Sequence, residues 1–441
     1  HSYSEAPKGR DDLLSMKQLS DLWTVDGATV KDSFAEMILV TAEAGTILKK
    51  LTRQLDKMGL GLQNMGAVDF QTISGAMLTG THGTGIKKPA VPDMVRSLGM
   101  VGTGGEFLQI EPTDGMTDPA KWDDSAGVRL IQDDDIFHSV ILGFGAMGII
   151  YEITLEVEKQ YYMLEKRVLR PWTELRMELL TGEFIQKVED TDFVAFRVNP
   201  YQVKGEHRCA VVEQEIVPKD IDLSGLAHPY RRNIFSSVMG NLIFLIENTI
   251  QKLLRKPERV KKTIQTALWA TQDKAFFGKS HEVLYQSGDG VIRYGISSEF
   301  AFPADGEKIV EVLEAIFARA KRNGDEAGLY QSAHIPVRFV PASKALLSSC
   351  YGRPTVFIDV PLLFGTTGDI EILEGYQKMM IDMGGIPHWG KHNTQLYQHK
   401  GFIQEQFPRA KDWTRIRDEL DPKGTFLNDF VVLMGLAELP N

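Results

Sequence analysis

One twelve-residue segment, Ser74–Gly85, constrains this chain more than any other. It reads Ser-Gly-Ala-Met-Leu-Thr-Gly-Thr-His-Gly-Thr-Gly and holds four glycines, three threonines and one histidine. Glycine has no side chain and costs backbone entropy, so the segment predicts neither a good helix nor a packed strand. It can instead bring bare backbone N–H groups and threonine hydroxyls close to a ligand. We therefore expect a loop that binds a pyrophosphate, while an elaborate turn is the structural alternative.

The spacing of these glycines differs from two common phosphate loops, the Gly-x-x-x-x-Gly-Lys-Ser/Thr loop and the Gly-x-Gly-x-x-Gly turn between a strand and a helix. From Leu60 to Gly85 the chain instead resembles the flavin-binding segment of the aldonolactone oxidase family. This family includes gulonolactone, arabinonolactone and alditol oxidases and belongs to the vanillyl-alcohol-oxidase type of FAD enzymes. The resemblance implies FAD as the cofactor. It implies cofactor contacts from Ser74, Gly75, Leu78, Thr79, Gly80, Thr81, His82, Gly83, Thr84 and Gly85.

Three later stretches resemble the same family. Val140–Ile150 carries a second glycine motif, which implies that Gly145, Gly148 and Ile149 lie near the adenine end of FAD. A core turn would use the same glycines. The other two stretches are His-Trp-Gly-Lys at 388–391 and an Asp-Pro-x-x-x-Phe-x-Asn ending that starts at Asp421.

The chain opens on His-Ser-Tyr-Ser. In the family a Gly-His-Ser element lies near the end of a small N-terminal lobe, and its histidine often bonds covalently to the flavin. The resemblance therefore implies that His1 and Ser2 bind the cofactor, with a covalent link through His1, whereas a frayed terminus is the structural alternative. It also implies that the lobe is absent here. We expect an incomplete flavoprotein whose missing segment, or a separate chain, covers Glu36–Ala44 and Gly143–Gly148.

Composition limits the partners of the chain. Its 441 residues carry a formal net charge of −10, which argues against nucleic acid, since a phosphate backbone needs clustered Lys and Arg. Two cysteines, Cys209 and Cys350, provide no disulfide framework and no metal-ligand set, and they fit a cytoplasmic protein. No apolar run is long enough to span a bilayer. The amphipathic, basic stretch 233–262 favours a core or dimer helix over peripheral membrane contact, which is the alternative.

The order of elements predicts an α+β protein with a vanillyl-alcohol-oxidase-type FAD-binding domain over residues 1–158. That region has strand and helix patterns over 36–44 and 46–58. From 159 to 404 several strands follow one another, which indicates a mostly antiparallel cap or substrate domain. The resemblance implies that residues 405–441 return to the flavin.

The catalytic candidates are Lys391, Arg338 and Glu299, and the candidates for substrate binding are Trp389 and His388. The resemblance places Lys391 at the flavin ring, where a cation would stabilise the anionic reduced ring. Arg338 matches the arginine of the family's Glu-x-Arg, but Pro336 stands where the glutamate would be. The identity of the general base therefore stays open. Glu299 is a spare carboxylate on a strand, or a residue at the edge of a ladder.

The resemblance implies an FAD-dependent oxidase or dehydrogenase that oxidises a CH–OH group of a small molecule, such as a sugar lactone or polyol. Hydride would pass to flavin N5 while a base takes the hydroxyl proton, and the electrons would then reach O2 or another acceptor. One alternative is a membrane-associated enzyme resembling decaprenylphosphoryl-ribose oxidase, which the missing glutamate favours. The other is a flavin-free binding protein.

Overall fold

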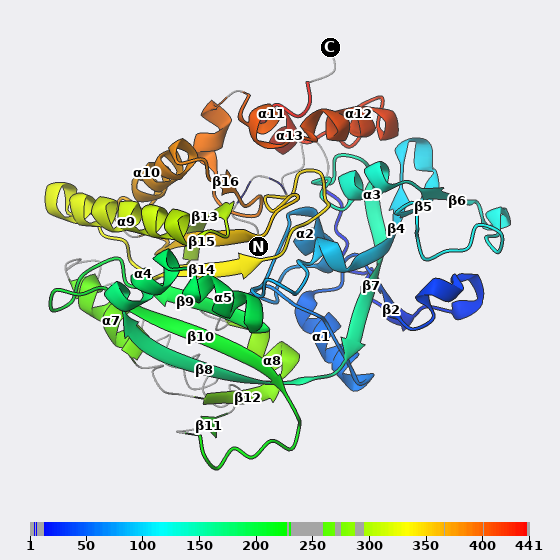
Figure 1. Cartoon of the computed structure of the whole chain (residues 1–441). Helices are drawn as coiled ribbons and strands as arrows, with labels where there is room; N and C mark the ends of the chain where they lie inside the picture. The colour runs from blue at the N-terminus through cyan, green and yellow to red at the C-terminus, as the bar shows by residue number, and fades with distance from the viewer. Residues whose placement is uncertain are drawn as a thin grey trace.

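The computed structural model describes residues 4, 6, 13–226, 229–230, 259–269, 275–286, 295–365, 367–399 and 401–438. Two sheets organise this part of the chain, and helices pack against both (Figure 1). His1, Ser2 and the helix expected over 233–254 lie outside the described residues, so the expectations that depend on them are untested.

The smaller sheet is centred on β7 (Ile149–Lys159), the long strand that pairs with three others. From Ile153 onward its apolar side chains alternate with glutamates, so one face is buried and the other is not. All pairs in this sheet are antiparallel except β5 with β6. Its other strands are β1 (Leu22–Thr24), β2 (Ile38–Glu43), β3 (Leu60–Gly61), β4 (Val95–Val101), β5 (Phe107–Glu111) and β6 (Val128–Gln132).

Three helices accompany this sheet: α1 (Leu48–Lys57), α2 (Ile73–Leu78) and α3 (Asp134–Val140). As expected, α1 buries leucines at helical spacing and is followed by Gly59 in the left-handed region, at φ 73°. The expectation that the glycine-rich segment forms no helix was wrong for Ser74–Leu78. Those residues belong to α2, because the Thr72 hydroxyl caps the helix by accepting the N–H of Gly75.

The larger sheet has the strand order β11-β12-β8-β10-β9-β14-β15-β13-β16. Its neighbours are antiparallel except β11 with β12. The strands are β8 (Tyr162–Pro171), β9 (Phe193–Val198), β10 (Arg208–Val217), β11 (Pro229–Tyr230), β12 (Ala275–Lys279), β13 (Gly295–Pro303), β14 (Ile335–Val340), β15 (Thr355–Leu363) and β16 (Ile386–Pro387). The helices that contact it are α4 (Trp172–Leu180), α5 (Glu183–Asp190), α7 (Val260–Trp269), α8 (Ser280–Leu284), α9 (Gly306–Arg322) and α10 (Asp369–Asp382).

The register of the larger sheet decides which polar side chains meet. Glu299 on β13 lies directly opposite Asp359 on β15, and Arg338 on β14 lies opposite Phe357. Residues two apart on a strand share a face of the sheet, so Phe357 and Asp359 lie on one face. Their cross-strand partners, Arg338 and Glu299, therefore lie on that face as well. Two carboxylates in directly opposite positions repel each other. A cation is therefore needed between them.

The last helices, α11 (Phe402–Gln406), α12 (Ala410–Leu420) and α13 (Asp429–Leu433), lie beside α3 and away from most of the larger sheet (Figure 1). The indole N–H of Trp413 donates to the carbonyl of Leu142 at 3.2 Å, and the side-chain amide of Asn428 donates to the carbonyl of Phe144 at 2.9 Å. These bonds bring the C-terminal segment to the second glycine motif. The predicted domain boundaries themselves stay predictions.

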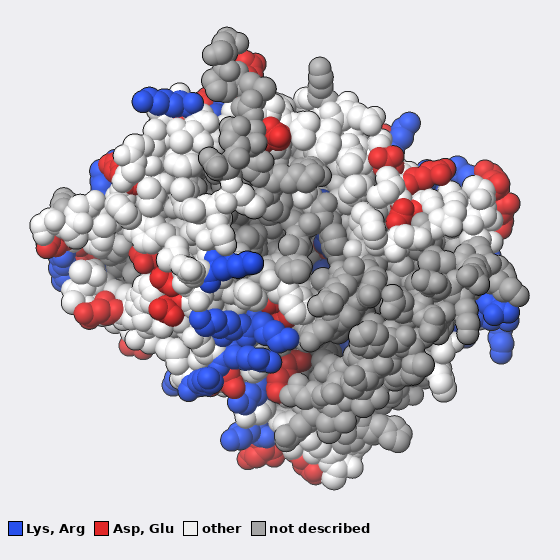
Figure 2. All heavy atoms as spheres, turned by 180° about the vertical axis from the view of Figure 1, so that it is seen from behind, with Lys and Arg blue, Asp and Glu red and all other residues white. Residues whose placement is uncertain are grey.

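Basic side chains gather in a band on the face seen from behind, whereas acidic and basic groups are interspersed elsewhere on that face (Figure 2). In the described part of the 233–262 stretch, the Lys261 ammonium lies 5.4 and 5.5 Å from the ring centres of Tyr201 and Tyr330. None of the helices in the described ranges is long and apolar enough to cross a membrane. Peripheral membrane contact stays a prediction.

Asp421 supplies a test of how the C-terminal segment is held. Its carboxylate is 1% exposed and accepts the N–H groups of Thr425 and Phe426, at 2.8 and 2.7 Å, and the hydroxyl of Thr103 at 2.9 Å. We expect Asp421→Ala to lower the free energy of unfolding by about 1–3 kcal/mol, because the N–H groups of Thr425 and Phe426 lose their acceptor. Glu419→Ala, at an exposed side chain of the preceding helix that pairs with exposed Arg415, is the matched control. Equal losses in urea unfolding would contradict this account.

Candidate active site

Three segments that are distant in the sequence converge on the carboxylate of Glu299, which is 1% exposed. The ring Nε2 of His82, from the glycine-rich segment, lies 3.8 Å from it. The Arg338 guanidinium of β14 lies 3.3 Å away, and the Lys391 ammonium, from the His-Trp-Gly-Lys stretch, lies 3.4 Å away. The structure therefore brings all three predicted catalytic residues together.

The charges around Glu299 explain why its carboxyl group is ionised. Burial by itself would raise the pKa of this carboxyl, but Lys391 and Arg338, with His82 beside them, hold the pKa well below its usual range. Burial lowers the pKa of His82 to about 4 and that of His388 to about 3, so both imidazoles are neutral at neutral pH. The centre of the cluster is thus one ionised carboxylate between two cations.

Asp359 is a second buried carboxylate in the cluster, and the sequence analysis missed it. Lys391 Nζ lies 3.1 Å from Asp359 Oδ2 and donates to the hydroxyl of Ser297 at 2.9 Å. Burial raises the pKa of Asp359, and the charge of Glu299 raises it further, while Lys391 and Arg338 oppose them. A signal was present in the sequence, because a lone aspartate in the apolar run Thr-Val-Phe-Ile-Asp-Val has to be stabilised by a partner.

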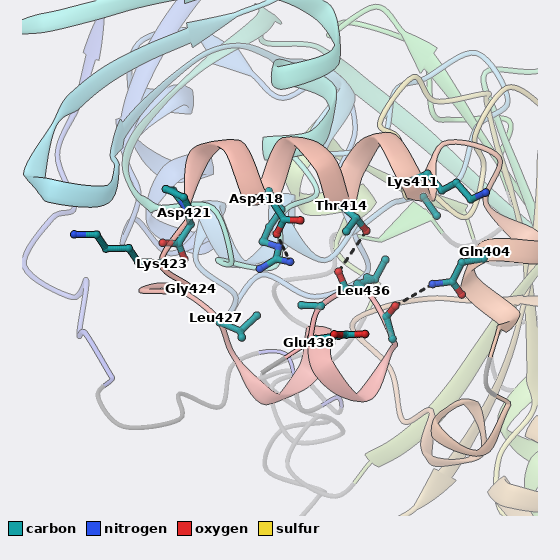
Figure 3. Close-up of a pocket in the computed structure, with 15 residues that line it drawn as sticks. Gln404, Lys411, Thr414, Asp418, Asp421, Lys423, Gly424, Leu427, Leu436 and Glu438 are labelled. Carbon is teal, nitrogen blue, oxygen red and sulfur yellow. Dashed lines mark hydrogen bonds and ion pairs between the residues drawn. The ribbon is translucent and has the colours of Figure 1, made fainter. Parts of the chain in front are cut away.

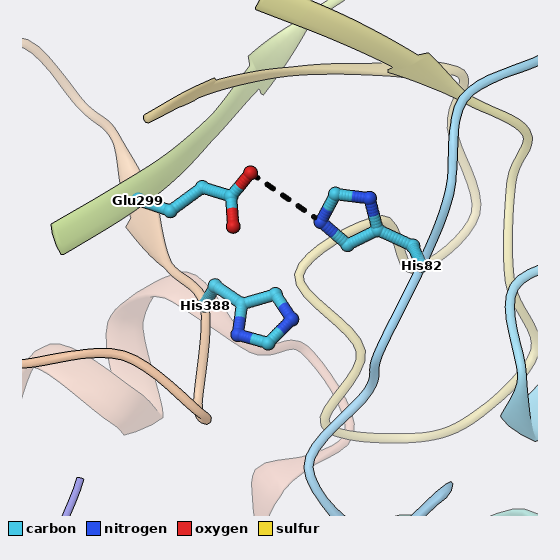
Figure 4. Close-up of side chains that lie close together, drawn as sticks. All are labelled: His82, Glu299 and His388. Atoms are coloured by element: carbon cyan, nitrogen blue, oxygen red, sulfur yellow. Dashed lines mark ion pairs between the residues drawn. The ribbon is translucent and has the colours of Figure 1, made fainter. Parts of the chain in front are cut away.

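His82, Glu299 and His388 each point a possible ligand atom toward the others, all within 4.8 Å (Figure 4). His82 is held in place by stacking on Phe357, at 3.8 Å between ring centres, which gives it a role beyond the loop geometry that the sequence indicated. A divalent cation here would have to lie beside Lys391 and Arg338, which already balance the carboxylate. We therefore interpret the three side chains as part of a cluster in which Lys391 and Arg338, and not a metal ion, balance the charge of Glu299.

A cavity of about 310 Å³ adjoins this cluster. Gly83 and Thr84 of the glycine-rich segment form part of its wall, and Arg338 and Asp359 form another part. Apolar side chains make up about half of the wall. The polar lining residues are Thr84, Arg197, Gln214, Gln286, His334, Arg338 and Asp359, of which Arg197 and Gln286 are joined by a hydrogen bond of 2.6 Å.

The glycine-rich segment offers backbone donors at this cavity. The N–H groups of His82, Gly83 and Thr84 have no acceptor among the residues that the structure describes. Buried N–H groups are rarely left unpaired, so three in succession fit a ligand that accepts hydrogen bonds. Two of the three expected threonine donors are not available, because the hydroxyl of Thr79 donates to the carbonyl of Gly75 and that of Thr84 to the carbonyl of Val194, whereas the Thr81 hydroxyl accepts from the side-chain amide of Gln71. Ser74 likewise donates to the carbonyl of Ala44.

Different physical requirements explain why the positions in the two motifs are glycine. A Cβ on Gly83 would lie 2.2 Å from Asn64 Oδ1, and one on Gly148 would lie 2.6 Å from Met100 Sδ, so internal packing requires both. A Cβ on Gly145 would meet nothing within 4 Å. Gly75 is exposed, and a Cβ there would meet only the Thr72 hydroxyl, at 3.1 Å. Gly75 and Gly145 are therefore the motif glycines that leave room for a ligand.

The expected role of Trp389 as a wall of the substrate site needs correction. Its indole is 1% exposed, donates to the carbonyl of Leu347 and packs against Phe144, Phe407 and Phe430. It belongs to an aromatic core and not to the lining of the cavity. His388 is in the charged cluster, where its backbone N–H donates to the carbonyl of Glu299 at 2.9 Å.

A larger cavity, of about 610 Å³, lies among α11, α12 and α13 (Figure 3). Its charged side chains, which include Lys411, Arg417, Asp418 and Glu438, are of both signs. Neither the loop amides nor the Glu299 cluster reaches it. We therefore place the candidate site at the smaller cavity.

Comparison with known proteins identifies the family. The sequence model of the D-arabinono-1,4-lactone oxidase family matches residues 153–433, which is more than half of the chain, and that of an FAD-binding domain matches residues 1–111. This chain belongs to the D-arabinono-1,4-lactone oxidase family. It is an FAD-dependent oxidoreductase that acts on a CH–OH group, and the unpaired loop amides fit that cofactor.

Named relatives align along most of their length. L-gulono-1,4-lactone dehydrogenase of Mycobacterium tuberculosis is 27% identical over 98% of this chain and 87% of its own. Alditol oxidase of a Streptomyces species is 23% identical over 98% of this chain and 88% of its own. Among solved structures, cholesterol oxidase from B. sterolicum superposes with a TM-score of 0.70 at 15% identity, covering 96% of this chain and 84% of its own. The fold is therefore of the expected vanillyl-alcohol-oxidase type.

Gly75 tests whether the flavin covers the glycine-rich segment. Alanine is a better helix former than glycine, so Gly75→Ala should leave the protein at least as stable. If FAD lies against this residue, the added methyl group should weaken FAD retention by ~10-fold, or about 1.4 kcal/mol. Gly27→Ala, where a Cβ would meet nothing within 4 Å, is the control. Unchanged FAD affinity with both variants would remove Gly75 from the cofactor site.

Proposed function

We propose that this chain oxidises a lactone, polyol or related carbinol whose reacting CH–OH group lies in the cavity beside Arg338 and Asp359, the latter paired with Lys391. One observation supports this most strongly. The loop that offers free amides, the sheet that carries Arg338 and the stretch that carries Lys391 meet at the single carboxylate of Glu299. The names of relatives, which act on L-gulono-1,4-lactone or on alditols, favour a polyhydroxylated substrate.

Each group of the protein at this site has a separate role in the proposed reaction. Bound FAD supplies the acceptor for hydride, and the amides of His82, Gly83 and Thr84 are the groups that would hold it beside the cavity. Lys391 keeps a positive charge where negative charge develops, in a site that largely excludes water. Arg338, which lines the cavity, orients a substrate oxygen, and ionised Glu299 fixes the positions of both cations.

The structure and the comparisons bear on the two alternative functions, a membrane-associated enzyme and a flavin-free binding protein. The membrane-associated alternative depended on the basic amphipathic stretch 233–262, most of which lies outside the described residues, and on the missing glutamate before Arg338. Glu299 supplies a carboxylate to that arginine from a different strand, so the departure at Pro336 is no longer an argument for a lipid substrate. The family and FAD-domain matches leave a flavin-free binding protein without support. A covalent bond through His1, a separate N-terminal chain and the identity of the electron acceptor stay open parts of the proposal.

Replacing the lysine tests the proposed role of the cation. We expect Lys391→Met to keep bound FAD but to slow its anaerobic reduction by substrate on the order of 10²-fold, as for one removed electrostatic contact. Stopped-flow absorbance measures this with L-gulono-1,4-lactone, D-arabinono-1,4-lactone and xylitol as substrates. Lys308→Met, at a lysine that pairs with Glu311 on the surface, is the matched control. Reduction of the Lys391 variant at the control's rate would contradict the assignment.

A further inference from the structure

The Asp359 side chain presents an unused acceptor to the cavity. It is 5% exposed and lines the cavity wall. Its Oδ2 lies 3.1 Å from Lys391 Nζ, whereas its Oδ1 is buried and has no hydrogen-bond partner in the part of the chain that the structure describes. Buried polar atoms are nearly always paired in native proteins, so an unpaired carboxylate oxygen at a cavity wall indicates that a bound molecule supplies the donor.

The other candidate bases of the cluster are occupied. Glu299 Oε1 faces Arg338 and His82, and its Oε2 faces Lys391, so neither oxygen is left for a substrate. Its lowered pKa makes it a weak base as well. His82 and His388, whose pKa values are also lowered, are not among the residues that line the cavity. Of the carboxylates in the described ranges, Asp359 alone forms part of that wall.

We propose that Asp359 is the general base of the reaction, an inference that rests on the proposed function. Its Oδ1 accepts the hydroxyl proton of the substrate while the hydride of the same carbon leaves to FAD. The electron pair of the broken O–H bond forms the C=O bond of the product. The substrate loses two electrons, FAD gains them, and the proton stays on Asp359 until solvent removes it.

The charges that face Asp359 suit this task. They are Lys391 from the loop after β16, Glu299 on β13 and Arg338 on β14. Burial and the Glu299 charge make the Asp359 carboxylate more basic than an exposed aspartate, which brings it closer to the working pH. Two facing carboxylates with pKa values shifted in opposite directions have different roles. Glu299 stays ionised and holds the cations, and Asp359 exchanges a proton.

The test compares Asp359→Asn with the wild-type FAD-loaded chain by anaerobic stopped-flow from pH 5 to 9, using the three substrates named above. We expect flavin reduction to slow by ~10²–10⁴-fold, the usual contribution of a general base, with little change in substrate KM. The wild-type rate should rise with pH as Asp359 ionises, and the variant should lose that rise. An unchanged rate or an unchanged pH profile would overturn the assignment.

Thermal unfolding supplies a readout that does not depend on activity. The pKa of Asp359 is raised in the folded protein, so the ionised form loses stability as the pH rises from the unfolded pKa through the folded one. Asp359→Asn escapes this loss, and its Tm at pH 7 should equal or exceed that of the wild type. A purely structural ion pair with Lys391 predicts a lower Tm instead.

The two proposals fail in different ways. If none of the three substrates reduces the wild-type chain, the proposed function is contradicted. If the wild-type chain is reduced and Asp359→Asn is reduced equally fast, the proposed function stands and the base assignment falls. Slow reduction together with a lowered Tm would also count against Asp359 as the base.

Discussion

The site depends on one buried ionised carboxylate. Glu299 lies on β13, between β15 and the edge strand β16 of the larger sheet, and is almost inaccessible to water, so its charge carries a large desolvation cost. Lys391 and Arg338 offset that cost only if the loop after β16 and strand β14 are correctly placed. The glycine-rich segment is fixed against the same sheet by the stacking of His82 on Phe357 and by hydrogen bonds from the Gly85 N–H to Phe339 and from the Thr84 hydroxyl to Val194. The placement of these segments and the balance of charge around Glu299 therefore depend on each other.

The register of the larger sheet places a second acid, Asp359, beside Glu299, and this pair gives the site its chemistry. Glu299 and Asp359 are opposite each other on neighbouring strands, and Lys391 reaches both. A pair of facing acids in a dry site cannot both ionise at low cost. Glu299 is paired with both cations and stays charged, whereas Asp359 is paired with Lys391 alone and, among the described residues, has one oxygen without a partner at the cavity wall.

Much of the fold was predictable because its signals are local. The strand at Ile38–Glu43, the helix at Leu48–Lys57 and its glycine end follow directly from β-branched content, leucine spacing and backbone freedom. Lys391, Arg338 and Glu299 were found through resemblance to a family, and the structure brings them together. The family and the cofactor were predicted in the same way, and both are confirmed.

The remaining features depend on contacts between distant segments, which periodicity does not encode. Asp359 looked like an ordinary strand residue until the register placed it opposite Glu299. The hydroxyls of Thr79 and Thr84 in the glycine-rich segment seemed available, but backbone carbonyls accept them. Trp389 was expected at the substrate because it belongs to the His-Trp-Gly-Lys stretch, yet its indole enters an aromatic core.

The claim that ionised Glu299 holds the site together is tested most directly by the free energy of unfolding of Glu299→Gln at pH 7. The substitution keeps the shape of the side chain and leaves two partly buried cations without their shared counter-charge. The account predicts a loss of about 3 kcal/mol or more in urea unfolding. Glu314→Gln, which removes an exposed carboxylate paired with Arg176, should cost less than about 1 kcal/mol. Equal stability of Glu299→Gln and the wild type would contradict the central claim.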